Sequence, residues 1–299
     1  MLTQFASIAL MGNLSDSRVA DSFRLLAAHL PTRGAKVLLA DNARIDGLPD
    51  SVERVAPDDL VQRVELIIAI GGDGSMLHAA RAAAVADIPL LGINRGRLGF
   101  LADVPPSEKP ELLDRLLAGD YVSEERMLLK AEICSADGTI DCGLALNDVV
   151  IKRQDTGRML EYESSVDGRF VNTHGGDGFI VATPTGSTAY ALSCGGPIVA
   201  PGLDAIVLAP ICPHTLSDRP IVIPATSVTE VRIIADATDS AEISCDGEVA
   251  GSIGAAARLR VAAADQHVNL IHPIGYDYYE ILRSKLNWGR GNRNPPAST

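Results

Sequence analysis

The stretch from Val64 to Arg81, VELIIAIGGDGSMLHAAR, restricts the possible folds of this chain more than any other segment. An apolar run over 66–70 is followed directly by GGDG, and a helical pattern begins near Ser75. An unbroken apolar run is typical of a strand buried on both faces of a parallel sheet. The glycines permit a sharp turn and a close approach of a ligand to the backbone, and the free N–H groups of the next helix favour phosphate. We therefore expect an open α/β sheet with an anion-binding turn at the carboxyl end of this strand.

The same alternation of strand and helix extends over the first 120 residues. Apolar runs alternate with amphipathic helical patterns, at 5–12, 17–34, 36–40, 75–86, 88–94 and 110–119. This order predicts an open, mostly parallel sheet with helices on both faces. We assign 1–120 to an α/β nucleotide-binding domain that carries GGDG.

The pattern changes after Tyr121. Short β-branched segments separated by Gly, Asp or Asn fill most of 121–272, apart from one short helical stretch, STAYALSCG. We assign these residues to an all-β, sandwich-like domain. The segment DYYEILRSKLNWG predicts a C-terminal helix that returns to the first domain, so 273–290 completes that domain. The polar tail 291–299 is expected to be disordered.

Composition excludes several classes of function. The 299 residues carry a formal net charge of -12, which argues against a nucleic-acid partner because phosphates require a basic face. The five cysteines stand far apart, as expected for reduced thiols in the cytoplasm. The six histidines show no metal-ligand spacing, so we expect no protein metal site. We also expect no signal peptide and no membrane partner, since the apolar runs are too short.

Asp73, inside GGDG, is unusual because its carboxylate would repel a phosphate bound at the turn. Such a carboxylate is useful if it accepts a proton from an attacking hydroxyl or helps to hold a metal ion. The alternative is that Asp73 caps the following helix. The spacing fits neither the P-loop nor G-x-G-x-x-G.

Further polar motifs follow along the chain. NRGRLGFL, over 94–101, lies one strand after GGDG and therefore at the same ligand-binding edge of the sheet. Asn147 and Asp148 interrupt a strand-like run, which indicates either a bend or a pair of ligand-binding groups. A second GGDG contains Asp177 and leads into the Thr- and Gly-rich turn TPTGSTAYALSCGGP.

In this order and at this separation, GGDGSMLHAAR, GINRGRLGFL, LNDVVI and DGFIVATPTGSTAYALSCGGPIV resemble the motifs of the bacterial NAD kinases. The resemblance extends from Ile8 to about Trp288. GGDG alone is shared with phosphofructokinases and with diacylglycerol and sphingosine kinases. The TPTGSTAYALSCGGP block is the specific part, because those kinases lack it.

The resemblance implies a phosphotransferase with an alcohol group as acceptor. It would use ATP, or in some members polyphosphate, and a divalent ion such as Mg²⁺ to phosphorylate the adenosine ribose 2′-hydroxyl of NAD, giving NADP. The β-rich domain would bind NAD, and the family usually forms homodimers or homotetramers. Asp73 would be the general base, with Gly72 and Gly74 close to the phosphates. The remaining implied site residues are Asn147, Asp148, Arg158, Asp177, Thr188, Ala189, Tyr190, Ala191, Leu192, Ser193 and Glu248.

The chain departs from the family pattern at several of these positions. Asp148 stands where many relatives have Glu, and Glu248 stands where relatives often have Gln. Gly175 and Gly176 stand where several relatives have a basic or polar residue, so the ligand contact of that side chain is either absent here or supplied by His174 or Arg169. Two other functions stay open at this stage: a non-catalytic NAD(H)-binding sensor, and a lipid or sugar kinase that shares GGDG.

Overall fold

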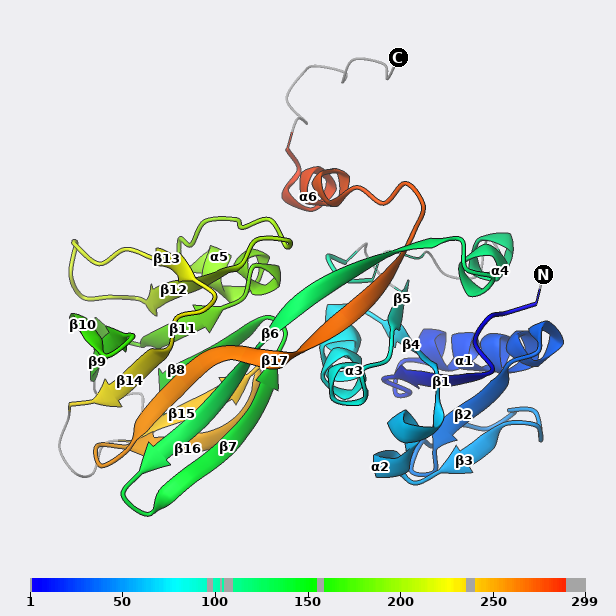
Figure 1. The fold of residues 1–299 in the computed structure, drawn as a ribbon, viewed down its shortest axis with the longest axis horizontal. Helices are drawn as coiled ribbons and strands as arrows, with labels where there is room; N and C mark the ends of the chain where they lie inside the picture. Colours follow the sequence, from blue (N-terminus) through cyan, green and yellow to red (C-terminus); the bar gives the residue numbers. More distant parts are fainter. Residues whose placement is uncertain are drawn as a thin grey trace. The chain divides into compact units, whose positions relative to one another are not determined.

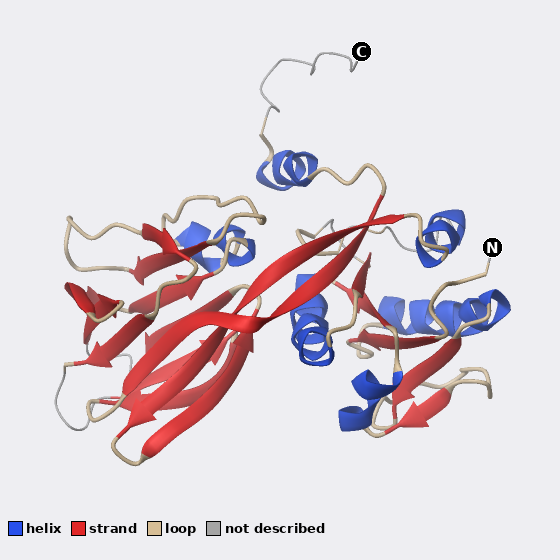
Figure 2. Ribbon diagram, in the orientation of Figure 1, coloured by secondary structure: helices blue, strands red, loops and turns tan. Residues whose placement is uncertain are grey.

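The computed structural model describes residues 2–95, 99–102, 104, 110–154, 159–234 and 240–288. The chain divides into two compact units. Unit 1 comprises Met1–Glu124 and Val268–Thr299, and unit 2 comprises Glu125–His267. Helices are concentrated in unit 1 and strands in unit 2 (Figure 2).

Unit 1 is an α/β unit built on a parallel sheet (Figure 1). Its strands are ordered β5-β4-β1-β2-β3, and the end of strand β17 (Arg258–Pro273) pairs with β5 in the same direction. The elements are β1 (Ser7–Gly12), α1 (Ser17–His29), η1 (Leu30–Arg33), β2 (Lys36–Ala40), β3 (Glu53–Val55), α2 (Pro57–Leu60), η2 (Val61–Arg63), β4 (Leu66–Gly71), α3 (Asp73–Ala86), β5 (Leu90–Asn94), α4 (Pro110–Leu117) and α6 (Tyr278–Leu286).

Helices cover both faces of this sheet. Side chains of α1 and α4 share one core cluster with Leu91 and Ile93 of β5. Between them, Gly92 points to the opposite face because side chains alternate along a strand. A Cβ on Gly92 would lie 2.7 Å from the sulfur of Met76, in α3. Helix α3 therefore covers the second face, as the doubly wound pattern predicts.

Unit 2 is built from antiparallel strands. One sheet has the order β13-β12-β11-β8-β15-β16, and further antiparallel strands run β10-β9-β14-β17, with β6 paired to β17 and β7. The elements are β6 (Tyr121–Ser135), β7 (Gly138–Ala145), β8 (Asp148–Arg153), β9 (Leu160–Val166), β10 (Arg169–Gly176), β11 (Gly178–Ala182), η3 (Thr185–Thr188), α5 (Tyr190–Ser193), β12 (Ala205–Ile211), β13 (Ile221–Pro224), β14 (Thr229–Ile233), β15 (Ser240–Cys245), β16 (Glu248–Gly254) and the larger part of β17.

The two groups of strands in unit 2 pack face to face. Tyr162 and Val231 of one group lie in the same buried cluster as Val149 and Phe179 of the other. The six-stranded sheet is also covered on its second face, where Ala191 of α5 packs against it. This double burial explains why β11 is buried at every position and has no polar alternation.

The predicted fold class is confirmed: a mostly parallel α/β unit, an antiparallel β unit and a C-terminal helix. The limits between the two units fall inside the long strands β6 and β17. Strand β12 has no counterpart among the segments recognised in the sequence. Its residues, AIVLAPI, are almost all buried, so they lack the period-two pattern that identifies a half-exposed strand. Among the described helices, none has the length and hydropathy needed to traverse a lipid bilayer.

Candidate active site

The GGDG turn of unit 1 begins where the fully buried strand β4 ends. Gly71 has φ +147°, and a Cβ at this position would collide with the Ser75 hydroxyl. Gly72 is extended, with φ −105° and ψ −168°, and it is the N-cap of α3. Its carbonyl accepts the N–H groups of Ser75 and Met76 at 3.1 and 3.3 Å. The helix therefore starts at Asp73, and the predicted start near Ser75 was wrong by two residues because extended Gly72 leads directly into the first turn.

At Gly72 and Gly74, unlike at Gly71, the described residues leave space for a side chain. Both are exposed, and a Cβ at either position would have no atom of the described residues within 4 Å. Neither residue has the positive φ that favours glycine. The packing of this unit therefore gives no reason for glycine at these two positions, whereas close approach of a ligand to the backbone does.

The Asp73 carboxylate contacts the loop that follows β5. Its Oδ2 accepts the N–H of Phe100 and its Oδ1 accepts the N–H of Leu101, each at 3.2 Å. A Cβ on Gly99 would collide with the same carboxylate. The alternative function of Asp73 as an N-cap is wrong, because Gly72 holds that position.

These contacts leave acceptor capacity on the carboxylate. Each carboxylate oxygen has two lone-pair sites, and among the described residues each Asp73 oxygen accepts one backbone N–H. Asp73 is half-buried at the first position of α3, where the helix dipole stabilises a negative charge. The group is held in place by the loop and can still accept a proton.

The loop after β5 lies beside the GGDG turn, as its predicted place at the sheet edge requires. The N–H of Arg95 donates to the carbonyl of Gly71 at 3.0 Å, and the Arg95 guanidinium donates to the hydroxyl of Ser22 in α1. Further along the same loop, Phe100 lies near helix α6: the Lys285 ammonium is 5.6 Å from the centroid of the Phe100 ring. Arg97 lies outside the described residues.

In unit 2, the chain around Asn147 is fixed by a residue far away in sequence. The carboxylate of Asp246 accepts three consecutive backbone N–H groups, those of Leu146, Asn147 and Asp148, at 3.0, 2.7 and 3.3 Å. Asp246 has φ +52°, and its own N–H donates to the Asp148 carbonyl at 2.9 Å. The sequence pattern does not indicate this anchoring role, because the partners of Asp246 lie 98 to 100 positions away.

Asp148 is almost completely buried, with 5% of its surface exposed. Burial and, to a smaller extent, the negative charge of Asp246 raise the pKa of its carboxyl group, the backbone N–H of Tyr190 lowers it, and the resulting pKa is about 7. Near neutral pH the protonated and ionised forms of Asp148 are therefore both populated. The side chain can donate as well as accept a hydrogen bond.

The TPTGSTAY block is bonded to the same turn. The Thr183 N–H donates to the Asn147 carbonyl at 2.9 Å, and the Thr183 hydroxyl donates to the Leu146 carbonyl at 2.5 Å. A Cβ on Gly186 would collide with the Asn147 backbone. The glycine and threonine of this block are thus explained by close packing against the Asn147 turn.

The block continues as η3 and the short helix α5, in agreement with the predicted helix. Thr188, Ala189 and Leu192 are half-buried, Ser193 is exposed, and Ala191 is buried in the core. The ring of Tyr190 is 44% exposed. Its partly exposed face leaves room for a stacked ring.

Asp177 belongs to the same region of unit 2. Its carboxylate lies 3.1 Å from the Arg153 guanidinium, and its N–H donates to the Ile211 carbonyl at 2.9 Å. Burial raises the pKa of the Tyr190 phenol, and the charge of Asp177 contributes in the same direction. Electrostatic coupling therefore links Tyr190 to Asp177, and a backbone hydrogen bond links it to Asp148.

The two remaining predicted site residues are Glu248 and Arg158. Glu248 is exposed at the start of β16, two residues after Asp246. Arg158 lies outside the described residues. Within the part of the chain that the structure describes, no group of three or more His, Cys, Asp and Glu side chains could hold a metal ion.

Comparisons with known proteins cover both units. Residues 21–121 match the ATP-NAD kinase N-terminal domain, and residues 146–273 match the ATP-NAD kinase C-terminal domain. The NAD kinase of Ectopseudomonas mendocina (strain ymp) is 45% identical over 289 residues, which is 96% of this chain and 98% of the relative. The NAD kinase of Nitrosococcus oceani is 43% identical over 290 residues, or 97% of this chain and 99% of the relative.

Two solved structures have a similar fold. A yeast NADH kinase complexed with NADH aligns with a TM-score of 0.87 at 22% identity, covering 97% of this chain and 89% of that one. An NAD kinase from Archaeoglobus fulgidus in complex with ATP aligns with a TM-score of 0.71 at 23% identity, covering 94% of this chain and 98% of that one.

Proposed function

The chain belongs to the ATP-NAD kinase family, and from that membership we propose how its own residues carry out the ATP-dependent phosphorylation of NAD to NADP. Membership through both domains rules out the lipid or sugar kinase that shares only GGDG. It also rules out the sensor without turnover, since the relatives are kinases.

The observation that carries the proposal is the pair of glycines, Gly72 and Gly74, which nothing in the packing of unit 1 requires. We assign to them the phosphates of ATP, which lie against the bare backbone and the first N–H groups of α3. Gly71 and Gly99 have a different task, since they shape the turn and the loop around Asp73.

Asp73 is the general base in this proposal. The 2′-hydroxyl oxygen of the adenosine ribose attacks the γ-phosphorus, the bond to the β–γ bridging oxygen breaks, and ADP leaves. The hydroxyl proton passes to the Asp73 carboxylate. The amides of Phe100 and Leu101 hold that carboxylate in one orientation, so its position does not have to be fixed during the reaction.

The residues of unit 2 bind the dinucleotide in this proposal. Asn147 and Asp148 hydrogen-bond the nucleotide, and their backbone is fixed by Asp246. Asp177 contacts a base or a ribose, and Tyr190 stacks on a ring. The backbone and side chains of 188–193 line the site around Tyr190. Arg158 and Glu248 remain candidates from the family resemblance alone.

A divalent ion, with Mg²⁺ as the first candidate, would neutralise the charge of the ATP phosphates. Mg²⁺ usually needs only one or two carboxylates besides substrate phosphates. Asp73, the carboxylate of the GGDG turn, would be available to help hold it.

A coupled NADP assay on the purified chain tests the proposed function. We expect NADP from NAD and ATP, with formation lost when the divalent ion is chelated and restored by Mg²⁺. Polyphosphate in place of ATP measures the donor range. Binding of NAD by calorimetry without NADP formation would contradict the function.

We further propose that the enzyme works in the cytoplasm as a homodimer or homotetramer. Light scattering on the purified chain measures the oligomeric state.

A further inference from the structure

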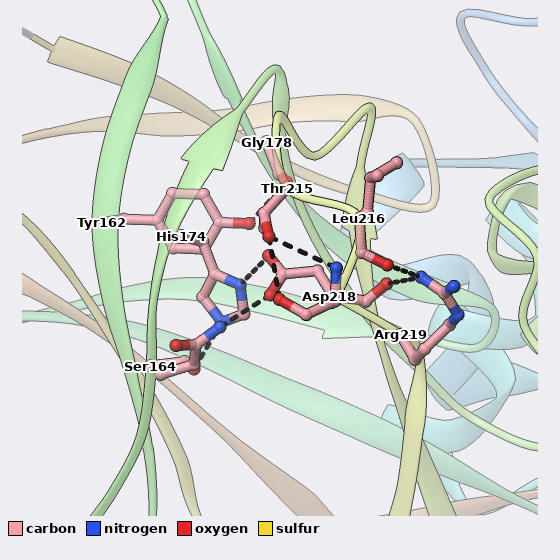
Figure 3. Close-up of polar contacts among 10 residues, drawn as sticks. Tyr162, Ser164, His174, Gly178, Thr215, Leu216, Asp218 and Arg219 are labelled. Atoms are coloured by element: carbon pink, nitrogen blue, oxygen red, sulfur yellow. Dashed lines mark hydrogen bonds and ion pairs between the residues drawn. The ribbon is translucent and has the colours of Figure 1, made fainter.

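Unit 2 contains a buried chain of hydrogen bonds that the proposed function does not use (Figure 3). The Ser164 hydroxyl lies 2.9 Å from Nε2 of His174, and Nδ1 of the same ring lies 2.9 Å from Oδ2 of Asp218. The second carboxylate oxygen, Oδ1, accepts the side-chain amide of Asn172 at 2.7 Å. Ser164, His174 and Asp218 are 1%, 6% and 8% exposed.

The order serine, histidine, aspartate is that of a hydrolytic triad, but the position of Ser164 does not suit a nucleophile. Ser164 lies in β9, opposite Asn172 of β10 on one side and Val231 of β14 on the other. The backbone amides around it are therefore committed to neighbouring strands. An acyl-transfer site needs donors aimed at the developing oxyanion, and paired strands do not supply them.

What the chain of hydrogen bonds does is hold a loop onto strand β10. Asp218 is in the connection between β12 and β13, and His174 and Asn172 are in β10. The His174 ring is fixed from a second side, because it stacks on Tyr162 with ring centroids 4.9 Å apart. The Tyr162 hydroxyl in turn donates to the Gly178 carbonyl at 2.8 Å.

The same loop touches the end of β10 just before Asp177. The N–H of His214 donates to the Gly175 carbonyl at 2.8 Å, and the Asp177 N–H donates to the Ile211 carbonyl at 2.9 Å. A Cβ on Gly176 would lie 2.7 Å from the Ile211 carbonyl oxygen and 3.3 Å from the Pro213 Cα. Glycine at 176 thus lets the loop lie directly on the backbone that leads to Asp177.

We propose that the His174–Asp218 pair is a positioning device for the dinucleotide site: it fastens the 212–219 loop to β10 and so fixes the backbone and side chain of Asp177. This role rests on the proposed contact between Asp177 and NAD. It also accounts for Gly176, since the backbone of 211–213 occupies the space that a larger side chain at this position would fill. Both ring nitrogens of His174 are engaged by residues of unit 2.

Asp218→Ala tests the proposal, with two matched variants. In Asp218→Asn, the side-chain oxygen can still bond His174. The new NH₂ group can donate to the side-chain oxygen of Asn172 once the Asn172 amide has rotated. Leu216→Ala changes a side chain of the same loop that is 94% exposed. We expect Asp218→Ala to raise the KM for NAD about tenfold or more while kcat and the KM for ATP change less than about threefold. Asp218→Asn should restore most of the loss, and Leu216→Ala should behave like the unchanged protein.

Hydrogen exchange gives a second measurement that needs no activity. Asp218→Ala should speed exchange of the Asp177 and His214 amides about tenfold, and Asn172→Ala, which removes one of the two partners, should have a smaller effect in the same direction. Unchanged exchange in a folded Asp218→Ala variant would overturn the role, and so would faster exchange with an unchanged KM for NAD. Labelling of Ser164 by a fluorophosphonate would also overturn it, in favour of a nucleophile. A complete lack of NADP formation by the unchanged protein would instead contradict the proposed function, while the exchange experiment would still test the loop.

Discussion

At the scale of single residues, the glycines around Asp73 fall into two kinds. Gly99 is required by the fold, because a methyl group there would meet the Asp73 carboxylate, while Gly74 has open space around its Cα. The two kinds should respond differently to the same substitution.

Gly74→Ala should leave the free energy of unfolding within about 1 kcal/mol of its original value, since alanine is the better helix former. The KM for ATP should rise about tenfold or more, because the methyl group takes the place of a phosphate contact. Gly99→Ala should cost about 1–3 kcal/mol in stability through overpacking. Urea unfolding and steady-state kinetics on both variants check this. A Gly74→Ala enzyme with an unchanged KM would show that no phosphate lies there.

Asp148 should make stability depend on pH in an unusual direction. Its pKa is about 7 in the folded chain, against 3.8 as the ordinary value. Between about pH 4 and pH 7 the folded state therefore binds more protons than the unfolded state, and the contribution of this residue to stability falls as pH rises. Above pH 7 the contribution is constant.

Asp148→Asn removes this titration. The free energy of unfolding of the variant minus that of the unchanged protein should increase by about 2–4 kcal/mol between pH 4.5 and pH 8. Denaturation curves at a series of pH values measure the difference. Leu216→Ala, at an exposed position without a titratable group, is the control and should give a difference that does not change with pH. A difference for Asp148→Asn that does not change with pH would contradict the raised pKa.

At the scale of elements, the turn before β8 depends on Asp246 more than on its own residues. Three consecutive amides point at one carboxylate. In Asp246→Asn, one of the two acceptor oxygens becomes a donor, so at least one buried N–H loses its partner. We expect a loss of about 1–3 kcal/mol in stability.

The same substitution should lower the pKa of Asp148, since it removes the nearby negative charge. Urea unfolding measures the first effect, and the pH dependence of stability measures the second. Asp137→Asn, in another Asp-Gly turn with an exposed side chain, serves as the control. Unchanged stability in Asp246→Asn would show that the turn holds without the carboxylate.

The elements that sequence patterns predicted well are those with a local signal. Strand β4 and helix α3 follow from an apolar run, a glycine turn and a helical period, and only the first residue of α3 was misplaced. Strand β12 is as fully buried as β4 but lacks a glycine turn and a helical period directly after it, and an apolar run alone does not distinguish a strand from a buried helix. The short strand β3 was missed because three residues are too few to show a period.

At the scale of the whole molecule, the predictable part of the candidate site is the part carried by continuous motifs. GGDG and TPTGSTAY can be recognised because their glycines and threonines are adjacent in sequence. Asp246 contacts residues about 100 positions away, and Asp218 contacts a histidine 44 positions away. No local pattern distinguishes these aspartates from solvated ones, so their roles required the three-dimensional structure.

The central claim is that Asp73 takes the proton from the ribose hydroxyl. The most direct measurement is the single-turnover rate of phosphoryl transfer in Asp73→Asn, with the Kd values for NAD and ATP measured by calorimetry. The account predicts a rate about 10²–10⁴ times lower with both Kd values changed less than about threefold, because the amide cannot take the proton, while its one acceptor oxygen still holds one of the two loop amides of Phe100 and Leu101. A folded Asp73→Asn enzyme that transfers phosphate within tenfold of the original rate would contradict it.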